Sequence, residues 1–90
     1  MLEIVLANTF RKDLKRATKC GLNLDHLTRV LNILAAEEKL PAKYRDHALT
    51  GDYGGFRECH IEPDWLLVYR IDADVLSLFL FRTGTHADLF

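Results

Sequence analysis

The second half of this 90-residue chain holds residues whose types could together cut RNA. They are three histidines, an aspartate and tryptophan after a proline, an arginine after an apolar run, and the final aromatic residue: His47, His60, His86, Asp64, Trp65, Arg82 and Phe90. Attack by a ribose 2′-hydroxyl on the neighbouring phosphate needs a base, an acid and a cation, but no metal ion. Imidazole suits both proton transfers because its ordinary pKa lies near neutrality. A guanidinium stays protonated and can bind two phosphate oxygens as negative charge builds up in the transition state.

Four sequence blocks that carry these residues also carry a family resemblance. They are HALTG (residues 47–51), GFRECHI (55–61), PDWLLVY (63–69) and RTGTHADLF (82–90). In order and spacing, over nearly the whole chain, they resemble the YafQ-type mRNA interferase toxins of the RelE superfamily. The resemblance implies catalytic or RNA-contacting roles for seven residues: His47, His60, Asp64, Arg82 and His86 as catalytic residues, and Trp65 and Phe90 in substrate binding.

The resemblance implies a metal-independent endoribonuclease that cuts messenger RNA on the translating ribosome. Its product ends would be a 2′,3′-cyclic phosphate and a 5′-hydroxyl. We assign Arg82 to transition-state charge, His60 and His86 to proton transfer in either order, and Asp64 to a proton relay or to orienting a histidine. His47 and Phe90 would position the RNA. The expected partners are the ribosome, mRNA and a cognate antitoxin that silences the chain, with no metal and no other cofactor.

Other interpretations compete with this one. A toxin of the same superfamily could act by binding a protein, as the gyrase-poisoning ParE branch does, although the histidine and C-terminal blocks argue against it. Taken singly, His47 is a loop residue, Asp64 suits a turn after proline for conformational reasons, and Trp65 is a wall of the core that also touches RNA. Phe90 could be a frayed chain end, and the alternative with a functional role is that its ring stacks on a base of the RNA.

Strand alternation separates two residues that could otherwise be paired. His60 is expected to share a face with Glu58 and Glu62, while Cys59 and Ile61 point the other way. A Cys59–His60 catalytic pair or zinc site is therefore not expected, and zinc-finger ligand spacing is absent. Without a secretory signal or a disulfide framework, the cysteines are expected to be reduced thiols of a cytoplasmic protein.

The charge of the chain is unusual for an RNA-binding protein. The formal net charge is −1, whereas phosphate binding favours a basic surface. Cations nevertheless gather in residues 11–19 and flank the middle loop between residues 39 and 57. The first cluster is most simply a solvated helix face, with ribosomal RNA or an acidic partner as the alternative. No apolar run is long enough to cross a bilayer, so a membrane role is not expected.

The remaining pattern predicts the elements that position the candidate site. An opening strand over residues 2–6 should bury one face, and an amphipathic helix capped by Asn8 or Thr9 should end at Gly21. A second helix should begin near Asn23 or Asp25 and form a hairpin with the first. A loop over residues 40–55 should lead into an antiparallel meander of strands 56–61, 65–71 and 75–82. The sequence predicts one RelE-like α+β domain over residues 1–90, a small antiparallel sheet with a two-helix hairpin on one face in the order β-α-α-β-β-β.

Overall fold

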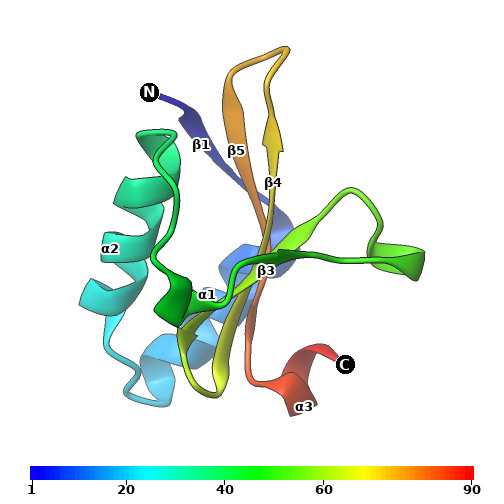
Figure 1. Cartoon of the computed structure of the whole chain (residues 1–90). Helices are drawn as coiled ribbons and strands as arrows, with labels where there is room; N and C mark the ends of the chain where they lie inside the picture. Colours follow the sequence, from blue (N-terminus) through cyan, green and yellow to red (C-terminus); the bar gives the residue numbers. More distant parts are fainter.

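The computed structural model describes residues 1–90 and contains a five-stranded sheet in the order β1-β5-β4-β3-β2 (Figure 1). The strands are β1 (Glu3–Leu6), β2 (His47–Ala48), β3 (Arg57–Glu62), β4 (Trp65–Asp72) and β5 (Ser77–Gly84). The helices are α1 (Asn8–Lys19), α2 (Leu24–Ala35) and α3 (His86–Leu89), with 3-10 turns η1 (Ala42–Tyr44) and η2 (Gly51–Tyr53). None of the helices has the length and apolar character that a membrane crossing requires.

The sheet confirms the predicted α+β class but is mixed. The meander β3-β4-β5 is antiparallel as predicted, whereas β1 lies parallel beside β5, with Glu3 opposite Ser77. Parallel pairing is possible here because both helices intervene between β1 and its partner, and parallel strands need such a crossover. The expected buried face of β1 is confirmed only in part: Leu2 is buried and Leu6 packs against the core, but Ile4 between them is exposed.

The two long helices begin in different ways. The residue before α1 is Ala7, which has no side-chain acceptor, so the predicted cap by Asn8 or Thr9 is wrong. Thr9 instead donates its hydroxyl to the carbonyl oxygen of Phe81 at 2.7 Å and ties α1 to β5. The predicted left-handed stop after α1 is confirmed at Gly21, whose φ is 78°.

The second helix and the loop after it follow the prediction more closely. Asn23 caps α2 by accepting from the backbone N–H of Asp25 at 3.0 Å, as predicted. The loop over residues 40–55 also contains η1, β2 and η2. The last strand begins two residues later than predicted, because Val75 and Leu76 lie exposed in the turn and Leu76 has a φ of 51°.

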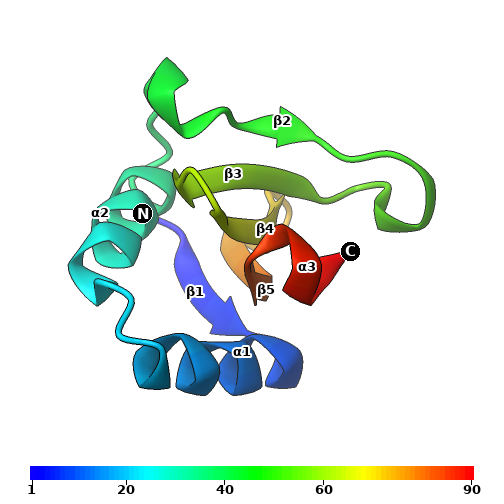
Figure 2. The ribbon, with the colours of Figure 1, turned by 90° about the horizontal axis from the view of Figure 1, so that it is seen from below.

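Both long helices cover one face of the sheet, α1 over β5 and α2 over β3 (Figure 2). The main core lies between these two helices and the sheet, and it includes Phe10, Val30, Leu67, Tyr69 and Leu78. A smaller buried cluster of Leu66, Val68 and Leu89 lies on the opposite face, where α3 packs against β5. The second face is therefore only partly covered, and it carries the candidate site.

A bulge in β3 changes which residues accompany His60. Ile61 is an extra residue between His60 and Glu62, which both pair with β4. A bulge interrupts strict alternation, so Glu62 lies opposite the core residue Trp65 on the helix side, where its carboxylate is 3.2 Å from Nδ1 of His26. The prediction that Glu62 shares a face with His60 is therefore wrong.

A second bulge changes the facing of residues at the end of β5. Phe81 is the extra residue between Leu80 and Arg82. Beyond it Thr83, not Arg82, lies opposite the core residue Leu67 and is fully buried. Without the bulge, Arg82 would share the helix-covered face with Leu80, and Thr83 would lie on the opposite face.

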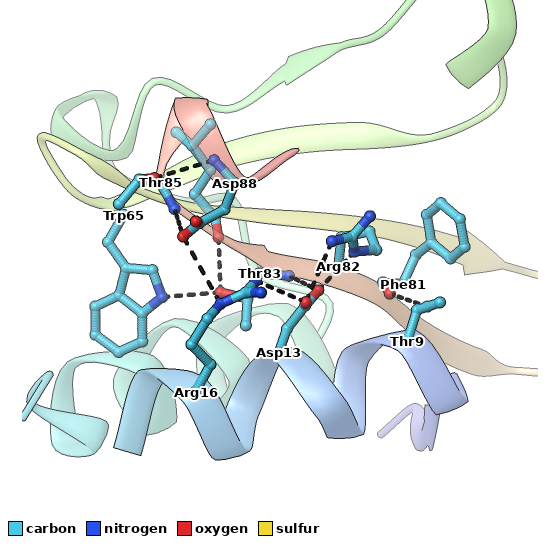
Figure 3. A network of polar contacts seen from close by, with 10 residues as sticks. Thr9, Asp13, Arg16, Trp65, Phe81, Arg82, Thr83, Thr85 and Asp88 are labelled. Carbon is cyan, nitrogen blue, oxygen red and sulfur yellow. Dashed lines mark hydrogen bonds and ion pairs between the residues drawn. The ribbon is translucent and has the colours of Figure 1, made fainter. Parts of the chain in front are cut away.

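A buried carboxylate on α1 holds this end of β5 (Figure 3). Asp13 is 4% exposed and accepts from Arg82 Nε at 2.6 Å, from Arg16 Nη2 at 2.9 Å and from the backbone N–H of Thr83 at 3.1 Å. Charged and backbone donors together offset the cost of burying a carboxylate. Thr83 extends the network, because its hydroxyl accepts from Trp65 Nε1 at 2.8 Å and donates to a β4 carbonyl at 2.7 Å.

Replacing Asp13 with asparagine should lower the free energy of unfolding by about 1–3 kcal/mol, because buried donors lose a charged acceptor. Urea unfolding measures the change. Asp72→Asn is the matched control, since Asp72 pairs with Arg70 at 3.1 Å on the surface, and an exposed pair contributes at most about 1 kcal/mol. Equal losses in the two variants would contradict the central role of Asp13.

Candidate active site

Two of the predicted histidines lie side by side on the face away from the long helices. The ring centroids of His60 and His86 are 5.7 Å apart, although the residues come from β3 and α3. The His60 side chain is 14% exposed and that of His86 is 56% exposed, so the His60 ring is largely buried and the His86 ring lies at the surface. The structure thus brings together the pair to which the sequence assigned proton transfer.

The short helix α3, which the sequence reasoning missed, positions His86. Thr85 and Asp88 form a capping box in which each side chain accepts from the other residue's backbone N–H, at 3.2 Å and 3.1 Å. The hydrogen bond that the Thr85 backbone N–H donates to the Asp88 carboxylate lowers the pKa of Asp88. Gly84 allows the tight turn, because a Cβ there would lie 3.0 Å from Cβ of Asp88. The Thr-x-x-Asp spacing is a capping signal that could have predicted the helix.

Both rings are held through Nδ1. Asp64 Oδ1 lies 3.3 Å from His86 Nδ1 and 3.4 Å from the His86 backbone nitrogen, so the turn after β3 contacts the start of α3. The Pro63 carbonyl oxygen lies 3.3 Å from His60 Nδ1. An oxygen acceptor favours the proton on Nδ1 and leaves Nε2 to exchange protons with a substrate. The arrangement fits the orienting role predicted for Asp64.

Glu58 is a central residue of the site to which the sequence reasoning gave no role. Its buried carboxylate lies 3.6 Å from Nε2 of His47 and 3.8 Å from Nε2 of His60, within ion-pair range of both. His47 reaches this position because β2 pairs it with Glu58, and its Nδ1 lies 2.8 Å from the Arg45 carbonyl oxygen. The expected shared face of Glu58 and His60 was the signal that could have identified this carboxylate.

The same atoms form a set that could hold a metal ion. Glu58, His60 and His86 each offer one ligand atom, and these atoms lie within 4.8 Å of one another. One carboxylate and two imidazoles suit ions such as Zn²⁺ or Cu²⁺. A bound ion would occupy the imidazole nitrogens that proton transfer requires.

Arg82 lies at the rim of β5, as the sequence predicted for the cation. Asp13 binds it side-on through Nε at 2.6 Å and Nη2 at 3.2 Å, and this hydrogen bonding raises the pKa of Arg82 further. Arginine carries five N–H donors, so three remain for another ligand, and the side chain is 25% exposed. The buried carboxylate therefore fixes the guanidinium without using all its donors.

The two aromatic residues expected to contact RNA differ in position. Trp65 is 1% exposed in the helix-side core, with its indole N–H bonded to Thr83. The expected core position of Trp65 is confirmed, and its contact with RNA stays a prediction. Phe90 is 59% exposed, and its ring makes a T-shaped contact with that of Tyr53 at a centroid distance of 5.4 Å.

Neither cysteine belongs to the group formed by Glu58, His60 and His86. Cys20 and Cys59 are both free, so they do not form a disulfide. Cys59 belongs to the helix-side core, and its burial raises the pKa of its thiol to about 12. The predicted separation of Cys59 from His60 is confirmed.

Comparison with known proteins identifies relatives over the full length. A family model described as the bacterial toxin YafQ of type II toxin-antitoxin systems matches residues 2–90. The mRNA interferase toxin YafQ of Escherichia coli K12 is 38% identical over 89 residues, covering 98% of this chain and 95% of the relative. A metal-bound toxin from Helicobacter pylori superimposes with a TM-score of 0.94 at 48% identity, with all of both chains covered. YafQ in the E. coli DinJ-YafQ complex superimposes with a TM-score of 0.90 at 37% identity, covering 100% of this chain and 99% of the relative.

Trp65 is the chain's one tryptophan and reports directly on its burial. We expect its fluorescence in the folded protein to resist acrylamide quenching, because the indole has almost no contact with solvent. Unfolding in urea should restore quenching and provides the control. Quenching of the folded protein as strong as that of free tryptophan would contradict the buried position.

Proposed function

The chain belongs to the YafQ family of toxins from bacterial type II toxin-antitoxin systems, and we propose that it cleaves mRNA on the translating ribosome without a metal ion. It is an endoribonuclease of the mRNA interferase class. The observation that carries the proposed mechanism is the His60–His86 pair, with ring centroids 5.7 Å apart and Asp64 beside His86. Two imidazoles at this separation can flank one phosphodiester.

The reaction needs two proton transfers and a displacement at phosphorus. One imidazole takes the proton from the ribose 2′-hydroxyl as its oxygen attacks the adjacent phosphorus. The bond from phosphorus to the 5′-oxygen breaks, and the other imidazole gives that oxygen a proton. The products are a 2′,3′-cyclic phosphate and a 5′-hydroxyl, and no metal-bound water is consumed. General acid–base catalysis by His60 and His86 supplies both transfers.

Arg82, Glu58 and Phe90 have supporting roles in the proposed mechanism. Arg82, with three free N–H donors, can bind the phosphate oxygens as their negative charge grows. The Glu58 carboxylate, 3.6 Å and 3.8 Å from the two neighbouring imidazoles, orients His47 and His60 and can accept a proton. The exposed ring of Phe90 can stack on an unpaired base.

The proposed regulation is capture by a cognate antitoxin. E. coli YafQ, which is 37% identical to this chain and has the same fold, forms a complex with DinJ. This complex supports an antitoxin as the partner of this chain. The alternative of a gyrase-directed toxin is not favoured, because the curated relatives that cover 98% of the chain are mRNA interferases.

Replacing His60 or His86 with glutamine should lower the cleavage rate roughly 100- to 10,000-fold, the usual contribution of a general acid or base. The assay measures cleavage of message on purified ribosomes. Thermal unfolding of each variant is the control, and both should keep the parental midpoint within a few degrees. Cleavage at the parental rate by either variant would remove that histidine from the mechanism.

Toxin dialysed against EDTA should cut message on magnesium-containing ribosomes at the untreated rate, because imidazoles and Arg82 supply the chemistry. Added Zn²⁺ should slow it, since the Glu58, His60 and His86 set would bind the ion through the same nitrogens. The same message without ribosomes should remain intact. Activity lost on dialysis and restored by Zn²⁺ would overturn the metal-free mechanism, and equal cutting without ribosomes would overturn ribosome dependence.

A further inference from the structure

A basic groove begins at His60 and leads away from the histidine cluster. Its volume is about 450 Å³, within the range of roughly 300–1,000 Å³ typical of ligand sites. Lys43 and Arg45 line it from η1 and the residue after it, Arg29 from α2, and His60 and Glu62 from β3. We call this cavity the His60 groove.

The cations of the groove are free to bind a ligand. Arg29, Lys43 and Arg45 are exposed and none of them forms an ion pair within 4.0 Å. The one carboxylate of the lining, Glu62, lies 3.2 Å from Nδ1 of His26. Three unpaired cations around a concave surface produce a positive potential that concentrates anions.

The shape of the groove follows from the sheet. β2 pairs with β3 only at Arg57 and Glu58, so the rest of β3 has an open edge. The bulge at Ile61 interrupts the strand there, and η1 contacts β3 beside that edge. The open edge thus lies between a catalytic histidine on one side and the cations on the other.

Arg45 connects the groove to the histidine cluster. Its φ is 50°, a left-handed conformation that is uncommon for residues with a Cβ and often marks functional positions. Its carbonyl oxygen lies 2.8 Å from Nδ1 of His47, while its side chain lines the groove. One residue therefore fixes a ring of the site and supplies a cation outside it.

We infer that the His60 groove binds the sugar-phosphate backbone of the RNA next to the phosphate that is cut. The inference rests on the proposed function and names where the substrate strand runs. Phosphate contact is favoured because three cations without ion-pair partners line the groove, whereas its tyrosine, Tyr44, is buried. A second cavity of about 590 Å³, which includes Lys39, Asp46 and Arg57, contacts none of the candidate catalytic residues.

The test uses a single-stranded RNA carrying 2′-O-methyl groups throughout, which cannot be cut because the nucleophile is blocked. The groove variant combines Arg29→Gln, Lys43→Gln and Arg45→Asn, with asparagine chosen because it tolerates a positive φ. Binding is measured by fluorescence anisotropy across a salt series. The slope of log affinity against log salt should become shallower by about 0.7 for each phosphate that is no longer neutralised, so by about 2 for the three cations together.

A matched control removes the same charge elsewhere, through Arg11→Gln, Lys12→Gln and Lys15→Gln on α1, and should keep the parental slope. In ribosome cleavage the groove variant should raise KM and leave kcat near the parental value, as for interactions made equally in ground and transition states.

Two outcomes would overturn the inference. One is an unchanged slope in the groove variant, which together with failure to bind the antitoxin would assign the groove to a protein partner. The other is an equal change in both variants. Because the RNA cannot be cut, neither of these results depends on whether the chain is a nuclease.

Discussion

The carboxylate of Asp13 fixes the part of the molecule from which the candidate site is built. It lies on α1, buried under the sheet, and accepts from both the guanidinium of Arg82 and the backbone N–H of Thr83. Thr83 in turn accepts from the indole of Trp65 on β4. Immediately beyond these residues the chain turns into α3, which carries His86. A single buried carboxylate thus holds the guanidinium of Arg82 and the end of the strand that leads to His86, a candidate catalytic residue.

Local sequence pattern predicted the two long helices and the strands β1, β3, β4 and β5, but it missed β2 and α3 and the facing of several strand residues. The spacing of apolar residues predicted both long helices, and the alternation of β3 correctly placed Glu58 with His60. Alternation failed at two bulges, Ile61 and Phe81, and neither carries the glycine or proline that would mark an irregular strand. These bulges depend on pairing between strands, which no single segment reveals. They occur beside His60 and Arg82, which fits the tendency of bulges to lie next to active sites.

Residues with distant partners were the other source of error. Asp13 lies among the cations of α1, a pattern that predicts a solvated helix face. Its burial could not be predicted from the local pattern, because its partners on β5 lie about 70 positions away in the sequence. Trp65 was placed in the core by the sequence, but its hydrogen bond to Thr83, 18 positions away, could not be predicted from the local pattern. Family resemblance therefore supplied the set of candidate residues, and the structure showed which of them are exposed and which are buried in the core.

The charge distribution explains how a chain with a net charge of −1 can still attract RNA. Several acidic residues are already engaged: Asp13, Asp46, Asp72 and Asp88 pair with arginines, and Glu58, Glu62 and Asp64 lie beside histidines. The cations of the His60 groove have no such partners. Net charge sums over paired and unpaired groups alike, whereas an approaching phosphate responds mainly to the local field. Cations without ion-pair partners can therefore give the groove beside His60 a positive local field although the chain as a whole is not basic.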